Sequence, residues 1–508
     1  YMVFEVRAMA GKQLNLTLGN GSGAVGTDTA PASSLEYYDP TANNGAGAWL
    51  AFTPGLTVPQ PAPCEPPGQS EAFHKSRYVV ANFHGAFYRA AQGGYFIAGQ
   101  NSAPNGGSDN LNPLLVTPAN GYNYTGTLID IAAGGECQYA IATTDGLWVW
   151  GTENQMVNGD QTNGSAFQKL TLPTNLVPAD IKFLSATDTG LAIVMKDGTV
   201  WVNVNSYGKV YDQGNGTTTG ALTPGFVQVL TGSAAPLSGI TQLEVCGGGA
   251  GGTAFAYNES TNTFYTWGNK AYMGDGTSSQ SLAFATAMTG PALPTGVTVV
   301  QVALTGDRGA NTYFVLGSDG RIYTMGANYE GDAGQGTEDV PLKSWTTVLN
   351  STGTAPLENV DFITAANSSP SDNYGAIIAV LRDGSVLAWG QSDNYMVGIN
   401  GRVLLPTTPT WLDPQGARPV FTAEAGGHLS ALILADQKGY VTVSGHNFGG
   451  SFGDGTTIDA EGFRTALFTG TENGGLAGSC DSSPKILVRV AVTQDTAFEQ
   501  KETVTLTA

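Results

Sequence analysis

Few residues of this chain have the types and spacing that catalysis needs. Its 508 residues include four histidines and four cysteines. The glycine run Gly247 to Gly252 lacks the Lys-Ser/Thr ending of a phosphate-binding loop. We find no G-x-S-x-G elbow between a strand and a helix, no H-E-x-x-H and no Cys/His metal spacing. The protein is therefore predicted not to be an enzyme, although a glycosidase-like carboxylate pair assembled by the fold stays an alternative.

Acidic, glycine-rich loops recur along the chain and could suit a calcium ion. They are NGDQTNG, YDQGNGT, MGDGTSS, EGDAGQGTED and FGDGTTID. Calcium prefers many oxygen ligands in a flexible loop, but none of these loops has the three-Asp ladder and terminal Glu of a complete site. Because Asp, Asn and Gly also favour tight turns, the pattern favours turns over calcium.

Five aromatic residues recur at one position of a repeated segment, and they are the candidate ligand-binding residues: Tyr207, Tyr272, Tyr329, Tyr395 and Phe448. We expect them to form a ring on one face of the molecule. If exposed, the ring would offer a broad amphipathic platform to a glycan or a protein. If buried, the same side chains would join neighbouring repeats, and the pattern favours this packing role.

The composition excludes several classes of protein. Lys and Arg number 21 against 41 Asp and Glu, a formal charge of -20, which repels nucleic acid and anionic lipid surfaces. No apolar run is long enough to span a bilayer, so no membrane insertion is expected. Charged residues are 12% of the chain and glycines number 70, a composition typical of turn-rich β-proteins.

The candidate residues lie in a repeat of short strands. A unit of apolar strand, tight turn, second strand ending in Gly and polar loop recurs between residues 78 and 470. Its turn residue falls at seven positions: Gly94, Gly146, Gly198, Asn262, Gly320, Gly384 and Gly439. We expect two-residue Asp-Gly turns in which both central residues have positive φ. Units of roughly 50 to 60 residues fit four-stranded propeller blades.

The repeat resembles the RCC1-type (regulator of chromosome condensation) repeat, which builds seven-bladed β-propellers. The W-G pair of that repeat is present as Trp150-Gly151, Trp267-Gly268 and Trp389-Gly390. The resemblance implies a structural role for His84 and His428, which occupy corresponding positions in their repeats. A propeller's first and last strands usually meet in one blade, so we expect such a shared blade here.

Both ends of the chain read as strands outside the propeller. Joined together, they resemble a Calx-β-like or immunoglobulin-like sandwich domain of bacterial surface adhesins. The predicted fold is therefore all-β, a seven-bladed RCC1-like β-propeller inserted in a β-sandwich. The expected boundaries are residues 1–63 and 485–508 for the sandwich, 64–77 and 471–484 for a neck, and 78–470 for the propeller.

Two further expectations concern the neck and the sandwich. Cys64 and Cys480 lie in the two neck segments, where a disulfide would join them; two free thiols are the alternative. Asp495, Glu499 and Glu502 match the acidic run of the Calx-β pattern, which implies a calcium site, although a solvated edge gives the same run. A strand edge after KETVTLT is expected to be covered by more chain or by a neighbouring copy.

These expectations lead to two functional hypotheses. In the first, the chain is an extracellular, cell-surface adhesion protein of a bacterium, with the sandwich as a spacer and the propeller as the head that binds a glycan or a protein. In the second, it is a secreted propeller that binds and inhibits a protein target. Both are non-catalytic binding roles. Neither involves nucleic acid.

Overall fold

The computed structural model describes most of the chain. The described residues are 2–7, 13–20, 33–39, 48–51, 56–57, 70–90, 93–135, 137–151, 166–187, 190–204, 208–248, 251–290, 293–307, 310–366, 375–413, 419–434, 440–467, 485–492 and 502–507. The chain divides into two compact units, which are Tyr1–Pro66 with Cys480–Ala508, and Pro67–Ser479. We call the first the end unit and the second the propeller unit. Within the described residues, no helix is long and apolar enough to cross a membrane.

The end unit consists of strands from both ends of the chain. One sheet has the order β1 (Met2–Arg7), β34 (Lys485–Val492), β3 (Ser33–Asp39) and β4 (Ala48–Ala51). The other has the order β35 (Glu502–Thr507), β2 (Gln13–Asn20) and β5 (Leu56–Thr57), so β35 lies at an edge of the described sheet. The pairs β1–β34 and β2–β35 are antiparallel. The two ends therefore belong to one β-unit, while its assignment as a Calx-β-like or immunoglobulin-like sandwich stays a prediction.

The propeller unit contains seven four-stranded sheets, which we call blades 1 to 7 in chain order. Blade 1 is β6 (Val79–Ala81), β7 (Gly85–Arg89), β8 (Tyr95–Gly99) and β9 (Asn110–Leu115). Blade 2 is β10 (Leu128–Gly134), β11 (Gln138–Thr143), β12 (Gly146–Trp150) and β13 (Gln168–Lys169). Blade 3 is β14 (Ile181–Thr187), β15 (Gly190–Met195), β16 (Val200–Val204) and β17 (Val227–Gln228). Blade 4 is β18 (Gln242–Gly248), β19 (Gly251–Asn258), β20 (Thr263–Ala271) and β21 (Gln280–Ala287).

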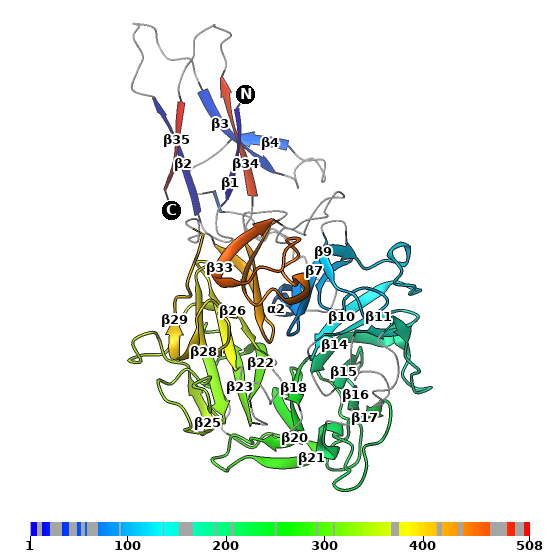
Figure 1. The fold of residues 1–508 in the computed structure, drawn as a ribbon. Helices are drawn as coiled ribbons and strands as arrows, with labels where there is room; N and C mark the ends of the chain where they lie inside the picture. The colour runs from blue at the N-terminus through cyan, green and yellow to red at the C-terminus, as the bar shows by residue number, and fades with distance from the viewer. Residues whose placement is uncertain are drawn as a thin grey trace, which may run out of the picture. The chain divides into compact units, whose positions relative to one another are not determined.

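The last three blades follow the same order. Blade 5 is β22 (Val299–Asp307), β23 (Ala310–Gly317), β24 (Ile322–Gly326) and β25 (Leu342–Thr347). Blade 6 is β26 (Val360–Ala365), β27 (Ala376–Leu381), β28 (Val386–Ser392) and β29 (Gly401–Thr407). Blade 7 is β30 (Val420–Ala425), β31 (Leu429–Leu434), β32 (Tyr440–Gly445) and β33 (Ala460–Leu467). The first strand of each blade lies against the first strand of the next, and these inner strands surround a common centre (Figure 1).

The predicted seven-bladed propeller is confirmed, but the expected shared blade is absent from the described sheets. Each blade consists of four consecutive strands, and blade 1 meets blade 7 without any strand exchange. We call the boundary between blade 7 and blade 1 the seam. Because no ladder of backbone hydrogen bonds joins these two described sheets, the seam depends on side chains and on single hydrogen bonds.

Polar side chains on or beside the inner strands tie each blade to the next. Each bonds to the backbone of the following blade: Asn82 Nδ2 donates to Gln138 O (3.1 Å), Asp130 accepts from Leu184 N (2.8 Å), Ser185 from Val245 N (3.3 Å), Gln242 from Val302 N (2.8 Å), Gln301 from Ile363 N (3.0 Å), Thr364 from Ala425 N (3.2 Å) and Glu424 from Ala81 N (3.4 Å). The last of these bonds crosses the seam and completes the circle. Burial of such groups is favourable only when their hydrogen bonds are made, so this polar circle favours one relative position of the blades.

The tryptophans of the W-G pairs have a structural role. Trp150, Trp267 and Trp389 are at most 1% exposed. Each indole Nε1 donates to a carbonyl oxygen in the loop of the preceding blade, at distances of 2.8, 3.3 and 2.7 Å respectively. A buried indole needs such a partner, which explains why Trp recurs at this position of the repeat.

The turns between the second and third strands differ from the expected geometry. In three of them Gly198, Gly320 and Gly384 have φ of 76°, 75° and 82°, whereas the Asp before each Gly has no positive φ. A bond such as Gly384 N to Leu381 O (2.8 Å), together with Leu381 N to Ser385 O (2.8 Å), identifies a type I turn with a glycine bulge. The Asp carboxylate instead accepts from the residue two positions later, as Asp383 does from Ser385 N (2.9 Å).

A short helix occupies part of the segment expected to be a neck. Helix α2 (Glu71–Lys75) begins after Ser70, whose hydroxyl accepts from Phe73 N at 3.1 Å. Lys75 is 5% exposed and is paired with Asp361 of blade 6. The Phe73 ring lies 5.2 Å from that of Phe183 in blade 3. The helix therefore lies inside the ring (Figure 1), and the propeller unit begins before residue 78.

Candidate functional site

Antiparallel strand order defines two faces of the propeller. The turns between first and second strands and the loops between third and fourth strands lie at the same end of every blade. We call this end the loop face. The turns between second and third strands and the connections between blades lie at the other end, which we call the turn face.

The predicted aromatic residues follow the third strand of successive blades and so lie on the loop face. Their exposure differs. Tyr272 is 5% exposed, Tyr329 and Tyr395 are half-buried, and Phe448 is 44% exposed. Tyr207 lies outside the described residues. Among the four that the structure describes, Phe448 is therefore the most exposed.

The less exposed members of this set contact neighbouring blades. The hydroxyl of Tyr313 in blade 5 accepts from the backbone N of Tyr272 in blade 4 at 3.3 Å. Burial raises the pKa of Tyr272. Tyr395 in blade 6 accepts a hydrogen bond at its carbonyl oxygen from Ser444 Oγ of blade 7 at 2.5 Å. These contacts match the packing role that the sequence favours.

Three exposed apolar residues come from the two blades that meet at the seam, and we call them together the seam patch. They are Phe448 and Ile458 of blade 7, which are 44% and 67% exposed, and Leu111 of blade 1, which is 39% exposed. Leu111 O accepts from Gly455 N of blade 7 at 3.1 Å, so residues from the two blades meet here. Large apolar side chains gathered at the surface are typical of interaction sites.

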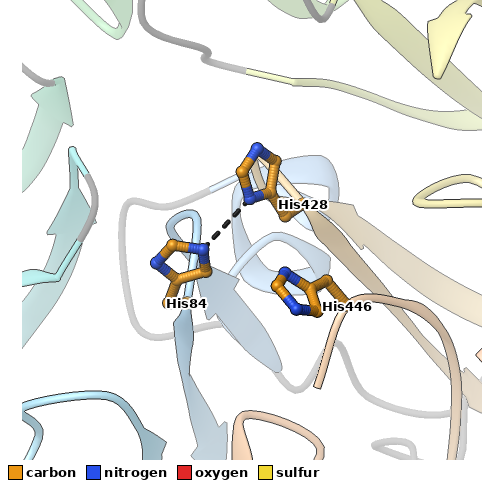
Figure 2. A group of neighbouring side chains, drawn as sticks. All are labelled: His84, His428 and His446. Carbon is orange, nitrogen blue, oxygen red and sulfur yellow. Dashed lines mark hydrogen bonds between the residues drawn. The ribbon is translucent and has the colours of Figure 1, made fainter. Parts of the chain in front are cut away.

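Three histidines form a cluster beneath this patch. His84 lies in the turn between β6 and β7, His428 in the equivalent turn of blade 7, and His446 directly after β32. His84 Nε2 lies 3.0 Å from His428 Nδ1. One ring nitrogen from each of the three histidines lies within 4.8 Å of the others, and the rings face one another across the seam (Figure 2).

The cluster is half-buried, and two of its members are neutral at ordinary pH. Burial lowers the pKa of His84 to about 4, with the charge of His446 acting in the same direction. Burial and the two other histidines lower the pKa of His428 to about 3. A neutral imidazole keeps one ring nitrogen unprotonated, which is the form that binds metal ions.

Aromatic rings surround the three histidines. The Phe448 ring centre lies 4.9 Å from that of His84 and 5.5 Å from that of His446. Phe83 contacts His428 edge to face at 4.7 Å. The seam patch and the histidine cluster are therefore one continuous site.

The sequence pointed to only part of this cluster. His84 and His428 were expected to have packing roles, and His446 was not singled out. The sequence did indicate that His84 and His428 could meet. They lie in equivalent turns of the first and last repeats, and these two repeats must be neighbours when the ring closes. His446 lies two residues before the predicted aromatic position of blade 7, so it shares that loop.

A G-x-S-x-G string lies at residues 449–453, in the loop after β32, but it is not a nucleophile elbow. The serine of such an elbow is exposed on a turn between a strand and a helix. Ser451 is instead fully buried, and its hydroxyl donates to His446 O at 3.3 Å. Its carbonyl oxygen accepts from the Tyr88 hydroxyl of blade 1. The string therefore serves the packing of the seam.

The centre of the ring is a second candidate site. Inner strands line a cavity of about 100 Å³ that contains Arg77, Gln301, Glu244 and Glu424. Burial raises the pKa of Glu244 to about 7 and that of Glu424 to about 8. Arg77 Nε is paired with Asp130 at 2.8 Å. This cavity could bind water or a small cation, but Glu424 already accepts from the propeller backbone.

The other predicted sites fall mostly outside the described residues. This is so for Cys64 and Cys480 of the expected disulfide and for Asp495 and Glu499 of the expected calcium site. Glu502 is the first residue of β35. Cys137 and Cys246 are both buried. Across the part of the chain that the structure describes, the three histidines are the only close grouping of three or more potential metal ligands.

Comparison with known proteins agrees with the fold. No model of a known protein family matches the chain. Over 374 residues it is 25% identical to protein pim1 of Schizosaccharomyces pombe, covering 68% of this chain and 63% of pim1. The alignment thus spans less than two thirds of that relative's length.

Solved structures give similar propellers. Prp20p from Saccharomyces cerevisiae matches with a TM-score of 0.54 and 18% identity, covering 83% of this chain and 94% of Prp20p. Human WBSCR16 matches with a TM-score of 0.52 and 15% identity, covering 76% and 91% respectively. Yeast RCC1 (Prp20) bound to Kap60 matches with a TM-score of 0.51 and 17% identity, covering 84% and 93%. These likenesses confirm an RCC1-like propeller fold; they give no support to the Calx-β-like resemblance.

Proposed function

We propose that this chain is a non-catalytic binding protein whose propeller binds a protein partner on the loop face. The observation that carries the proposal is the seam patch. Phe448 and Ile458, in the loop between β32 and β33, and Leu111, in β9, expose large apolar side chains. Aromatic and apolar anchors at the centre of a polar surface are where most binding energy resides in protein interfaces.

The charges around the patch indicate the chemistry of the partner. Asp109, Asp459 and Glu461 are exposed beside it, and the chain as a whole carries a formal charge of -20. The only nearby described arginine, Arg464, is paired with Asp454 at 2.9 Å. A partner with an apolar centre and a rim of Lys or Arg would complement this surface and would be attracted over a distance.

A non-catalytic role is supported by the partners of the buried carboxylates. Glu424 accepts from Ala81 N and from the Thr364 hydroxyl, at 3.4 and 3.1 Å. Asp212 accepts from Lys209 N and Gly252 N, at 2.7 and 2.9 Å. Carboxyl groups that join neighbouring segments through such hydrogen bonds have a structural role.

The shared fold also supports a protein partner. Prp20p has binding properties toward Gsp1p and histones, and yeast RCC1 (Prp20) has been crystallised with Kap60. An RCC1-like propeller is thus a scaffold on which protein binding sites occur. Extracellular adhesion and target inhibition stay alternatives predicted from the sequence, and the seam patch would serve either one.

The test compares two double variants of the full chain. Phe448→Ser with Ile458→Ser removes the apolar centre of the seam patch. Val177→Ser with Leu412→Ser removes apolar side chains of similar exposure, 47% and 49%, from connections between blades. Each protein is immobilised, and proteins retained from an extract of the source organism are quantified by mass spectrometry.

We expect one or a few proteins to be retained by the wild type and by the control, and lost from the seam-patch variant. Their binding should weaken as salt is raised, because an acidic rim attracts a basic partner. A specific partner that binds the seam-patch variant as well as the wild type would show that the partner site lies elsewhere. Turnover of a substrate by the pure chain would overturn the non-catalytic role.

A further inference from the structure

The histidine cluster has a geometry that packing alone does not require. His84 Nε2 of blade 1 and His428 Nδ1 of blade 7 are hydrogen-bonded at 3.0 Å, and the ring of His446 lies beside them. All three side chains are half-buried, so solvent reaches the cluster but does not fill it. Histidine is the commonest protein ligand of transition metals.

We propose that His84, His428 and His446 bind one divalent transition-metal ion, with Zn²⁺ the ion that fits best, and that this ion bridges blades 1 and 7. Three histidine nitrogens with one open position are a common ligand set for Zn²⁺. Tetrahedral zinc with nitrogen ligands at about 2.0 to 2.1 Å places those nitrogens roughly 3.3 Å apart. His84 Nε2 and His428 Nδ1 are hydrogen-bonded at 3.0 Å, and one nitrogen of each of the three rings lies within 4.8 Å of the others, so ring rotation has to shorten these separations by at most about 1.5 Å.

Groups behind the rings are placed to orient two of them. His446 Nε2 lies 3.9 Å from the carboxylate of Asp459, while the buried Nδ1 of the same ring lacks a hydrogen-bond partner. If Nδ1 binds the metal, Nε2 carries the proton and can donate to Asp459. A carboxylate that accepts from the far side of a ligating histidine is a recurrent feature of zinc sites.

His84 has a similar neighbour. Its Nε2 faces His428, and its buried Nδ1 and the buried Oε1 of Gln100 both lack a hydrogen-bond partner of good geometry. Gln100 adjoins His84, because its backbone N donates to His84 O at 2.8 Å. Metal binding at Nε2 would fix the proton on Nδ1, and a small rotation would let it donate to Gln100. Both orphaned atoms would then be satisfied.

A bound ion would stabilise the closed ring at the seam. The seam joins the first and last blades without a shared sheet, and His84 and His428 belong to the two blades that must meet there. An ion that binds only the closed ring stabilises it in proportion to the logarithm of its concentration over its dissociation constant. The metal proposal does not rest on the proposed protein-binding role, although Phe448 belongs to the seam patch and its ring contacts His84 and His446.

The experiment titrates the tag-free, chelator-treated full chain with Zn²⁺ in a calorimeter. It also measures the visible absorption of the Co²⁺-loaded protein. We expect one equivalent of Zn²⁺ to bind with submicromolar affinity and Co²⁺ to give the strong bands of tetrahedral coordination. X-ray absorption of the Zn²⁺-loaded wild type should show imidazole nitrogens at about 2.0 to 2.1 Å.

Three variants make the result specific. His446→Ala should weaken Zn²⁺ binding by at least about 100-fold, and Asp459→Asn by about 10- to 100-fold. The matched control is His74→Gln, because His74 of helix α2 is the one histidine of the chain outside the cluster. Its affinity should equal that of the wild type. Circular dichroism of each metal-free variant checks that it is folded.

Two outcomes would overturn the proposal. One is a wild-type chain that binds neither Zn²⁺ nor Co²⁺ up to millimolar concentration, in which case the cluster is a neutral packing feature. The other is unchanged binding in folded His446→Ala, which places the ion elsewhere. If His446→Ala does not fold, the absorption data on the wild type decide, and a zinc environment without imidazole nitrogens refutes the site.

Discussion

Removal of one hydroxyl at the seam should show that this boundary opens more readily than the others. Tyr88 in β7 is fully buried, and its hydroxyl donates to the carbonyl oxygen of Ser451 in blade 7 at 2.7 Å. Tyr139 in β11 is equally buried and donates to the carbonyl of Gln100 in blade 1, also at 2.7 Å. The two bonds have the same length, but the first is buried and crosses the seam, whereas the second is part-buried and joins blades 1 and 2.

The free energies follow from the loss of one donor in each variant. Tyr88→Phe leaves the buried carbonyl of Ser451 without its donor, and Tyr139→Phe leaves the part-buried carbonyl of Gln100 without its donor, each at a cost of about 1 to 3 kcal/mol. The two variants should therefore lose similar global stability in denaturant. Blades 1 and 2 are joined by a short stretch of chain that keeps them close when contacts break, whereas blades 1 and 7 are not consecutive. Local opening should thus be concentrated at the seam.

Amide hydrogen exchange distinguishes the two boundaries. The amide of Gly427 donates across the seam to Asn82 O at 3.3 Å, and that of Phe83 donates to Gly135 O of blade 2 at 3.2 Å. In Tyr88→Phe, peptides that contain Gly427 should exchange roughly 5- to 150-fold faster, which is the same 1 to 3 kcal/mol expressed as an opening equilibrium. Peptides that contain Phe83 should change much less.

The reasoning would be refuted by either of two patterns. If Tyr88→Phe accelerates exchange equally in all seven blades, the ring opens only by global unfolding and the seam has no special status. If Tyr139→Phe accelerates the Phe83 peptides as much as Tyr88→Phe accelerates the seam, chain connection does not control opening. Both measurements use metal-free protein.

Three other predictions follow from single contacts. Trp389→Phe should cost about 1 to 3 kcal/mol in urea unfolding, because a buried loop carbonyl loses its indole donor, whereas half-buried Trp411→Phe should cost less. Folding raises the pKa of Glu424 from 4.5 to about 8. Its contribution to the free energy of unfolding is therefore fully present below pH 4.5 and is lost as the pH rises through 8. Glu424→Gln should make the fall of the urea midpoint between about pH 5 and 8 less steep. Gly384 and Gly94 have similar φ values of 82° and 76°, but a Cβ added at Gly384 would lie 2.5 Å from its nearest neighbour, whereas one added at Gly94 would lie in open space. Gly384→Ala should therefore lower the urea midpoint more than Gly94→Ala, and equal losses would contradict this.

The sequence was sufficient to predict the ring because the repeat carries its own structural signals. Gly or Asn recurs at the turn position and Trp before Gly recurs in three copies. Each has a local physical reason: a positive φ at Gly94, Gly198, Asn262, Gly320 and Gly384, and a buried indole at the tryptophans. Seven copies then give seven blades. A period of this kind needs no knowledge of distant contacts.

The exact geometry of the turns was less accessible from the sequence. The expected two-residue turn was wrong because Asp-Gly also suits a type I turn with a glycine bulge. In that turn Gly384 has a positive φ and Asp383 does not. The same two residue types therefore fit both turns, and only the backbone hydrogen bonds distinguish them.

The closure of the ring was also mispredicted. A shared blade is usual in propellers, but here the polar circle and the histidines meet at the seam instead, and neither has a signature within one repeat. Helix α2 was missed because it is five residues long, too short for helical periodicity to be visible.

The pairing of β1 with β34 sets the order in which the protein can assemble during synthesis. Met2 pairs with Val490, so the first strand leaves the ribosome long before its partner exists. At about 5 to 20 residues per second, the delay is on the order of 25 to 100 s. Blades 1 to 6 can form in that interval, while β1 and β2 wait for their C-terminal partners and are open to association with other nascent chains. The end unit is therefore the part of the molecule whose yield should depend most on translation rate and on chaperones.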